Sequence, residues 1–309
     1  MKWLRYIWAL IRLGRPHFLA GGVILYLLGV SMALYSGAAL NVSALFWGQL
    51  VVTATQLMTH YANDYFDLGA DQANRTPTVW SGGSRVLVNG RVPARIALSI
   101  ALALAGFVFV ANLILSTQIQ PGAGTFGLLL LAQLLAWFYS APPVRLHSRG
   151  IGELSTAVTV TLLTPLVGFY LQMGAITRLP VLAVLPLCCM QFAMLLVIEF
   201  PDAAGDRFAG KRTLVVRLGP EVAAKLYSIA LLAAYAVLPL LWLAGLPPVV
   251  IAGVAALSPL ALYQAWCVYR GDWQKPTRWN ALSLYTIVLL MATALVEMAA
   301  FIWLIVTRT

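Results

Sequence analysis

The chain has 309 residues, of which 61% are hydrophobic and 10% are charged, and its formal net charge is +10. Soluble globular proteins carry charge on about a quarter of their residues, so this composition excludes a soluble protein and indicates a polytopic membrane protein. The excess of positive charge has a topological explanation and requires no nucleic-acid partner.

The amino-terminal segment, residues 1–16, combines tryptophan and isoleucine with lysine and arginine, which is typical of a helix lying in the membrane interface. Apolar stretches of about 20 residues follow, each long enough to cross the hydrocarbon core of a bilayer. They run over residues 17–36, 43–66, 93–116, 122–141, 151–174, 180–200, 221–244, 248–269 and 279–306. The sequence therefore predicts an all-α membrane protein with nine transmembrane helices.

The distribution of lysine and arginine predicts how these helices are oriented. Basic residues collect on cytoplasmic loops. With the amino terminus in the cytoplasm, eighteen of the twenty Lys and Arg residues fall on the cytoplasmic side, and only Arg178 and Arg308 fall on the other. The sequence thus predicts a multi-pass protein of the cell (inner or cytoplasmic) membrane, with its carboxyl terminus on the opposite side.

A polar stretch from Gln56 to Asp71 ends the second predicted span. Its Asn63, Asp67 and Asp71 are spaced four residues apart, so a helix places them on one face, with Asp64 beside them. Carboxylates this close repel one another unless a cation lies among them, and hard oxygen donors are the ligands that Mg²⁺ prefers. The pattern predicts a metal site; the alternative is an ordinary solvated helix end.

A second acidic stretch repeats the first at a displacement of 135 residues. Gln56, Asp64, Asp67 and Asp71 are matched in this way by Gln191, Glu199, Asp202 and Asp206. The repeat is parallel, because both stretches follow spans that run from the outside to the inside. Pro201 is expected to break or kink the helix within the second stretch. We therefore predict two cytoplasmic active-site loops, residues 67–92 and 201–220, that together carry one site.

Two facing acidic clusters are suited to binding a diphosphate through bridging Mg²⁺. The candidate cations that would contact the diphosphate directly are Arg85, Arg145, Lys211 and Arg212, although a basic residue near a membrane is often only topological. Gln56 and His60 continue the polar face into the bilayer, where they line a second substrate's pocket or bond between helices. Glu297, in the last span, is expected to snorkel toward the surface or to be paired.

Together these residues resemble the UbiA-type intramembrane prenyltransferases over essentially the full chain. The resemblance rests on three segments: Asn63-Asp64-x-x-Asp67-x-x-x-Asp71, Tyr139-Ser140, and Asp202-x-x-x-Asp206 with Gly210-Lys211-Arg212-Thr213-Leu214 behind it. It implies a single domain over residues 1–309, with helices around a central cavity that opens to lipid and a cytoplasmic-side active site. The runs GKRTLVVRLG and YSAPPVRLHSRGIGEL look most like the 1,4-dihydroxy-2-naphthoate branch of that family.

The resemblance also implies a reaction, the Mg²⁺-dependent transfer of a polyprenyl group from a polyprenyl diphosphate to an aromatic acceptor. The expected metal ligands are Asn63, Asp67, Asp71, Asp202 and Asp206. The expected catalytic residues are Asp64, Asp67, Tyr139 and Arg145. Asp64 would assist proton loss or orient the acceptor, and Tyr139 would stabilise the allylic cation with its ring or bind a diphosphate oxygen with its hydroxyl. The expected substrate-binding residues are Gln56, His60, Arg85, Ser140, Lys211 and Arg212.

Three alternatives remain open at this point. The acceptor could instead be 4-hydroxybenzoate, homogentisate, haem or chlorophyllide. A cation transporter would also carry intramembrane acids, but its sites usually lie near the midplane, often between inverted repeats. A CDP-alcohol phosphotransferase would carry its acids in one continuous motif, which this chain lacks.

Overall fold

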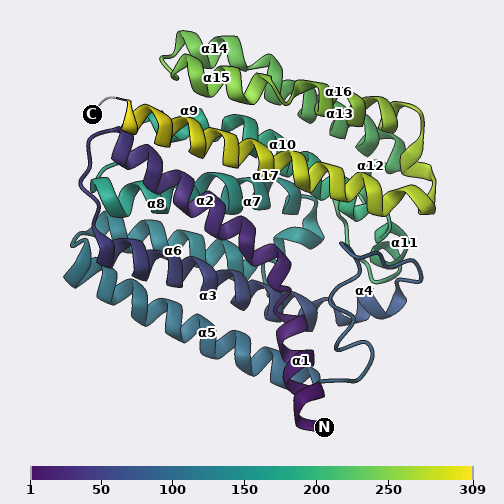
Figure 1. Ribbon diagram of the computed structural model, residues 1–309. Helices are drawn as coiled ribbons and strands as arrows, with labels where there is room; N and C mark the ends of the chain where they lie inside the picture. Colours follow the sequence, from purple (N-terminus) through teal and green to yellow (C-terminus); the bar gives the residue numbers. More distant parts are fainter. Residues whose placement is uncertain (1, 308–309) are drawn as a thin grey trace.

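The computed structural model describes residues 2–307, which form helices and connecting loops without a β-strand in that range (Figure 1). The first half contains α1 Lys2–Leu13, α2 Pro16–Tyr35, α3 Val42–Phe66, α4 Leu68–Ala73, α5 Ala94–Ile114, η1 Leu115–Ile119, α6 Ala123–Phe138, η2 Leu146–Arg149, α7 Gly152–Thr156, η3 Ala157–Leu163 and α8 Thr164–Met173. The second contains α9 Arg178–Ala183, α10 Leu185–Glu199, α11 Ala203–Phe208, α12 Leu214–Leu218, α13 Pro220–Ala236, α14 Leu238–Leu243, α15 Pro248–Ala255, α16 Ser258–Tyr269, η4 Asp272–Gln274 and α17 Pro276–Val306. The prediction of an all-α fold is confirmed.

Seven helical segments of the described chain are long and apolar enough to cross a membrane, which indicates a multi-pass membrane protein. They are Pro16–Tyr35, Ala94–Ile119, Gly152–Met173, Arg178–Glu199, Pro220–Leu243, Pro248–Tyr269 and Pro276–Val306. The predicted count of nine is not confirmed. The span expected at 43–66 forms α3, which ends in the polar residues of the first acidic stretch. The span expected at 122–141 forms α6, whose 16 residues extend over only about 24 Å.

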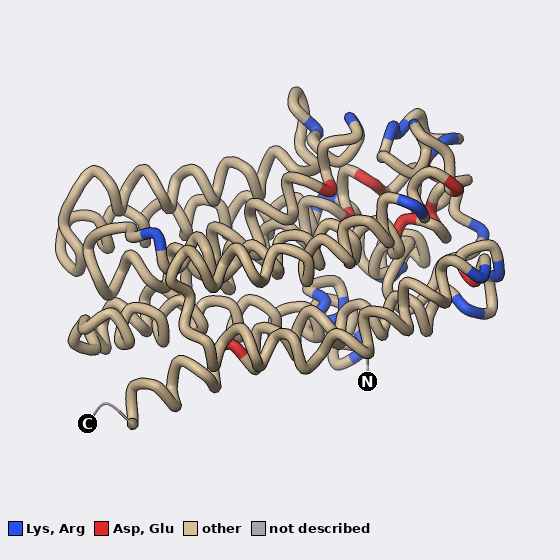
Figure 2. Tube along the Cα trace, turned by 90° about the horizontal axis from the view of Figure 1, so that it is seen from above, with Lys and Arg blue, Asp and Glu red and all other residues tan. Residues whose placement is uncertain are grey.

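Charged residues gather toward one end of the helices, as Figure 2 shows for the described residues. One predicted position is wrong. Glu297 neither snorkels nor pairs, because it is fully buried in α17 and neither carboxylate oxygen has a hydrogen-bond partner among the residues described. It takes no part in the acidic clusters discussed below.

The 135-residue repeat extends to the secondary structure. Adding 135 to the bounds of α4, residues 68–73, gives the bounds of α11, residues 203–208. Each short helix follows a break at the end of a longer one: α3 ends at Phe66, and α10 ends at Glu199, two residues before Pro201. The expected break at Pro201 is therefore present. The helix assumed to run unbroken from Asn63 to Asp71 is instead interrupted at Asp67.

Small residues bring the helices that carry the site close together. α2 packs on α8 so tightly that a Cβ atom at Gly29 would lie 1.9 Å from the carbonyl oxygen of Pro165. A Cβ atom at Gly22, also on α2, would lie 2.1 Å from the Gln56 side chain on α3. Because helix pairs in membranes gain from close backbone approach, these glycines fix α3 and its polar end within the bundle.

Candidate active site

The last turn of α3 delivers the first acidic cluster. The Asp67 amide still donates to the Asn63 carbonyl at 2.8 Å, and the Asp71 amide to the Asp67 carbonyl at 2.9 Å, so the predicted spacing persists across the break. The Asn63 Nδ2 atom donates to Asp67 Oδ2 at 2.8 Å and to Ser140 Oγ at 3.0 Å. Asn63, Asp67 and Ser140, all predicted site residues, are thereby brought together.

Lys211 joins the two acidic clusters. Its Nζ atom lies 3.1 Å from Asp67 Oδ2 and 3.1 Å from Asp206 Oδ1. All three side chains are largely buried, and the Lys211 amide also donates to the Asp206 carbonyl at 2.8 Å, which fixes the loop after α11. One cation therefore already lies between a carboxylate of the first cluster and a carboxylate of the second.

Asp202 is held by neutral donors on the first half of the chain. Asn74 Nδ2 donates to its Oδ1 at 2.6 Å, and the Gly82 amide donates to its Oδ2 at 3.1 Å. The short helices α4 and α11 lie side by side here. Their backbones approach so closely that a Cβ atom at Gly205 would lie 3.0 Å from the Asn74 amide nitrogen. The two segments predicted as active-site loops thus cover the same site.

The carboxylates differ in charge state. Burial raises the pKa of Asp67, but Lys211 and His147 outweigh it and hold that pKa below its usual range. Burial and then the charges of Asp67 and Asp64 raise the pKa of Asp71 to about 8. Burial and then Asp206 raise the pKa of Asp202 to about 6. Near neutral pH, Asp67 is ionised, whereas the carboxyl group of Asp71 holds a proton for much of the time.

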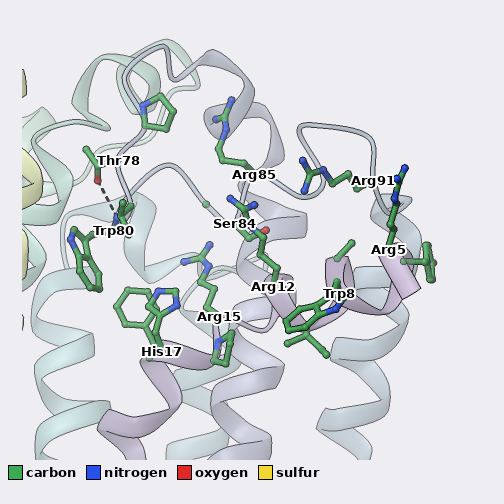
Figure 3. A pocket seen from close by; sticks show the side chains of 18 of the residues that line it. Arg5, Trp8, Arg12, Arg15, His17, Thr78, Trp80, Ser84, Arg85 and Arg91 are labelled. Atoms are coloured by element: carbon green, nitrogen blue, oxygen red, sulfur yellow. Dashed lines mark hydrogen bonds between the residues drawn. The ribbon is translucent and has the colours of Figure 1, made fainter. Parts of the chain in front are cut away.

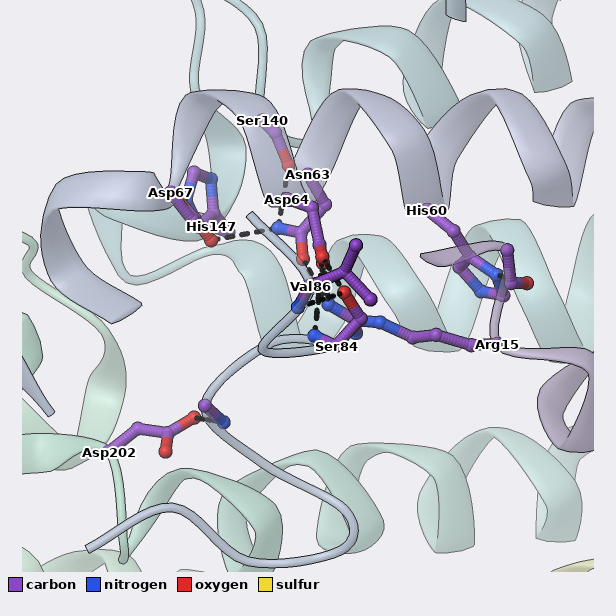
Figure 4. Close-up of polar contacts among 12 residues, drawn as sticks. Arg15, His60, Asn63, Asp64, Asp67, Ser84, Val86, Ser140, His147 and Asp202 are labelled. Carbon is purple, nitrogen blue, oxygen red and sulfur yellow. Dashed lines mark hydrogen bonds and ion pairs between the residues drawn. The ribbon is translucent and has the colours of Figure 1, made fainter. Parts of the chain in front are cut away.

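Asp64 is bound by Arg15 and Ser84 (Figure 4). Arg15 forms an ion pair with it, and Ser84 donates to it from its hydroxyl and from its amide, the latter at 3.3 Å. Arg15 adopts the left-handed conformation, with φ 48°, between α1 and α2. Strained backbone of this kind costs about 1–3 kcal/mol and clusters at functional sites.

His147 fixes the orientation of Asp67. Its Nε2 atom lies 2.6 Å from Asp67 Oδ1, and its Nδ1 atom lies 2.5 Å from the carbonyl oxygen of Tyr139. Both neighbours are acceptors, so the two contacts hold the imidazole ring between Tyr139 and Asp67. The Tyr139 ring, whose centroid is 5.2 Å from that of His147, lies beside the same network.

An interior cavity of about 240 Å³ begins beside this network and extends between α3, α6 and η3. Gln56, His60, Asn63 and Tyr139 line it, together with Arg15 and apolar side chains of α6 and α8. His60 Nδ1 lies 2.7 Å from the Gly14 carbonyl oxygen, whereas Gln56 Oε1 is buried and has no partner among the described residues. The predicted second-substrate residues thus share one cavity.

The predicted diphosphate-binding arginines are placed unequally. Arg85 lies in the site, since its guanidinium group donates to the carbonyl oxygen of Asp71. Its backbone adopts the left-handed conformation, with φ 62°. Arg145 and Arg212 have exposed side chains, and in the described part of the chain neither makes a side-chain contact with the acidic clusters. The Arg212 backbone amide donates to the Ser148 carbonyl at 3.0 Å.

The fit of a metal ion follows from these positions. Within residues 2–307, no group of three or more Asp, Glu, His or Cys side chains is close enough to hold a metal ion. Mg²⁺ usually takes one or two carboxylates and fills its other positions with water and substrate phosphates. The donors here are oxygens, and a cation already bridges Asp67 and Asp206. The arrangement therefore suits a Mg²⁺ ion that binds together with a phosphate group.

Sequence reasoning missed four site residues: Arg15, Asn74, Ser84 and His147. Each is separated from its acidic partner by at least 20 residues. Arg15 was counted only as a topological charge. The available signals were that His147 lies inside the segment YSAPPVRLHSRGIGEL and that Ser84 directly precedes the candidate Arg85.

Comparisons with known proteins agree with this geometry. The chain is 26% identical over 249 residues to 1,4-dihydroxy-2-naphthoate octaprenyltransferase from Bacillus subtilis, covering 79% of this chain and 74% of that protein. It is 30% identical over 249 residues to digeranylgeranylglyceryl phosphate synthase from Ignicoccus hospitalis, covering 76% and 77%. Its fold resembles that of a UbiA homologue from Archaeoglobus fulgidus solved with DMAPP and Mg²⁺, with a TM-score of 0.63, 18% identity and coverage of 94% and 99%. Because the family model matches residues 23–288, the chain belongs to the UbiA prenyltransferase family.

Proposed function

We propose that this protein transfers a polyprenyl group from a polyprenyl diphosphate to an aromatic acceptor within the membrane, with Mg²⁺ as its cofactor. The observation that carries the proposal is the position of Lys211 between Asp67 and Asp206, which places a cation between the two acidic clusters. The structural relative solved with DMAPP and Mg²⁺ supports the choice of donor and metal.

The residues that would hold Mg²⁺ are Asn63, Asp67, Asp71, Asp202 and Asp206. When bound, the metal supplies positive charge to the diphosphate oxygens and so makes pyrophosphate a better leaving group. Asn74 and His147 hold Asp202 and Asp67 in place. The clusters thus meet the metal with side chains that are already oriented.

The chain's own cations assist departure of the pyrophosphate. Lys211 and Arg85 lie at the acidic clusters and would counter the charge that develops on the leaving oxygen. The allylic C–O bond breaks, and the Tyr139 ring stabilises the allylic cation through its π-face. Arg145 and Arg212 are exposed in the described structure, so Lys211 and Arg85 are the cations that we assign to the diphosphate.

The interior cavity receives the reacting groups. Its apolar walls accept the prenyl chain and exclude water, which would otherwise quench the allylic cation. Gln56 and His60, which line the cavity, orient the acceptor. Its electron-rich carbon then attacks the allylic cation. The ring then loses a proton, or carbon dioxide where a carboxylated carbon is attacked. Asp64, through its ion pair with Arg15, orients the acceptor or assists proton loss.

The acceptor that we propose is 1,4-dihydroxy-2-naphthoate, which would place the reaction in menaquinone biosynthesis. The similarity to the Bacillus subtilis octaprenyltransferase supports it. Other acceptors remain the alternative, because the Ignicoccus hospitalis relative is named for a glyceryl phosphate product. Purified full-length protein, incubated with Mg²⁺, labelled polyprenyl diphosphate and the five acceptors considered above, decides between them.

Asp67→Asn tests the role of the clusters, with Glu221→Gln as the matched control. Glu221 is exposed at the start of α13 and pairs only with Lys225 in the described structure, so its loss removes the same charge outside the site. We expect Asp67→Asn to abolish prenyl transfer and Glu221→Gln to retain it. Full activity in Asp67→Asn would refute the two-cluster site, and Asp67-dependent cation flux through vesicles would favour a transporter instead.

We also propose the finer topology: one domain over residues 1–309 with nine membrane-spanning helices, including α3 and α6. The amino terminus and the segments 67–92 and 201–220 would then lie in the cytoplasm. A reporter fused after residue 309, which lies outside the described residues, is expected to be non-cytoplasmic. A cytoplasmic signal would contradict the odd number of spans.

A further inference from the structure

A second, larger cavity adjoins the site, between α1 and the segment that follows α4 (Figure 3). Its volume is about 1310 Å³. We call it the arginine cavity because five arginines line it: Arg5, Arg12, Arg15, Arg85 and Arg91. None of the described residues that line it is acidic.

Three of these arginines have no counter-charge within residues 2–307. Arg15 is paired with Asp64, and Arg85 donates to a carbonyl oxygen. The exposed side chains of Arg5, Arg12 and Arg91 form no hydrogen bond or ion pair with any residue that the structure describes. Like charges around one cavity repel, and a guanidinium group binds phosphate or carboxylate oxygens in a two-point contact. The cavity is therefore built to receive an anion.

The surroundings of the cavity indicate where that anion comes from. The outer face of α1 exposes large apolar side chains, with Trp3 80% and Trp8 68% exposed. A helix with such a face lies in the headgroup region of a bilayer, and indole rings prefer that depth. Trp8 and Ile11 also line the cavity, so its basic lining adjoins an apolar edge. A ligand with a charged head and an apolar body matches both.

We propose that the arginine cavity binds the phosphate headgroup of an anionic phospholipid of the surrounding leaflet. Cytoplasmic leaflets are rich in anionic lipids, and the uncompensated arginines lie on the side where the charge distribution places the cytoplasm. The lipid phosphate would contact Arg5, Arg12 and Arg91, while Trp8 and Ile11 pack against the glycerol and the first methylene groups. Arg15 lines both this cavity and the interior one, so the lipid would brace the linker that positions Arg15 against Asp64.

The test measures lipid binding rather than activity, so its outcome is independent of the proposed function. Full-length protein in neutral detergent micelles is titrated with fluorescent phosphatidylglycerol, and with the phosphatidylcholine analogue as the uncharged comparison. The variant carries Arg5→Gln, Arg12→Gln and Arg91→Gln together. The matched control carries Arg75→Gln, Arg95→Gln and Arg207→Gln, which removes the same charge from exposed positions that do not line the cavity.

We expect phosphatidylglycerol to bind the native protein more tightly than phosphatidylcholine, and the variant to bind it about 100- to 200-fold more weakly, from roughly 1 kcal/mol for each of the three arginines. The control is expected to stay within about twofold of native. Should the triple variant not insert, Arg91→Gln alone, in a loop, is expected to lose about fivefold. Unchanged binding in the variant, equal loss in the control, or displacement of the lipid by 1,4-dihydroxy-2-naphthoate would each overturn the proposal.

Discussion

Replacing Lys211 by glutamine tests the two-part site most directly. The Lys211 ammonium lies 3.1 Å from each of two carboxylates, and the exposed fractions of the Lys211, Asp67 and Asp206 side chains are 15%, 10% and 6%. At an effective dielectric constant of about 20, a unit-charge pair at this distance attracts by roughly 5 kcal/mol before the cost of desolvation. Removing one partner of such a buried pair destabilises a protein by about 3–5 kcal/mol. We expect a loss of that size for Lys211→Gln.

The same variant should become unusually responsive to Mg²⁺. Without the ammonium group, Asp67 and Asp206 face each other, and a divalent ion can take its place. A ligand that binds only the folded state, at a concentration 100 times its dissociation constant, increases the free energy of unfolding by about 2.7 kcal/mol. The assay is thermal unfolding in detergent, with MgCl₂ compared with NaCl at equal ionic strength.

Lys225→Gln is the control for this experiment. It removes the same charge from a pair with Glu221 in which the two side chains are 68% and 72% exposed. Pairs of this kind contribute at most about 1 kcal/mol. The reasoning is refuted if Lys211→Gln is no less stable than this control, or if Mg²⁺ stabilises it no more than the native protein.

Three shorter predictions concern the acidic side chains. Asn74→Ala removes the donor to Asp202, a charged hydrogen bond of about 1.5–3 kcal/mol, and should raise the Mg²⁺ concentration for half-maximal prenyl transfer about 10- to 100-fold. Gly83→Ala should lose most activity in the same transfer assay while still inserting, because its Cβ atom would lie 2.0 Å from Asp71 Oδ2 and its φ is +71°. Mg²⁺ competes with protons for Asp71 and Asp202, whose pKa values are raised to about 8 and about 6. The apparent affinity of the protein for Mg²⁺ should therefore increase from pH 6 to pH 8, and a Mg²⁺ titration at each pH checks this.

The acidic half of the site could be predicted from sequence because its residues are local. The four-residue spacing of Asn63, Asp67 and Asp71 holds whether or not the helix is continuous, since the backbone hydrogen bonds survive the break at Asp67. Charged groups are also scarce in this chain, so an acidic side chain beside an apolar run stands out. The approximate positions of the helices could be predicted from the same contrast between long apolar runs and scarce charged residues.

The basic half could not be predicted in this way. The predicted topology places eighteen of the twenty Lys and Arg residues on one side of the membrane. Residue type alone therefore does not separate Arg15, which pairs with Asp64, from Arg145, which is exposed. Their local conformations are also alike, with φ 48° and 49°. Only the packing of the α1–α2 linker against α3 decides which arginine reaches an acid, and that contact spans 49 residues of sequence.

The duplicated acidic clusters are compensated in different ways, and this difference bears on how the metal binds. Asp67 faces the imidazole ring of His147 and the ammonium group of Lys211, whereas Asp202 faces the neutral donors Asn74 and Gly82. A Mg²⁺ ion arriving alone would have to displace the Lys211 ammonium or a proton, so the proposed site would resist it. A diphosphate would bring oxygens that the ammonium could bind instead, which would release the Asp67 and Asp206 carboxylates for the metal. Mg²⁺ and the prenyl diphosphate should therefore bind cooperatively, each increasing the affinity of the other.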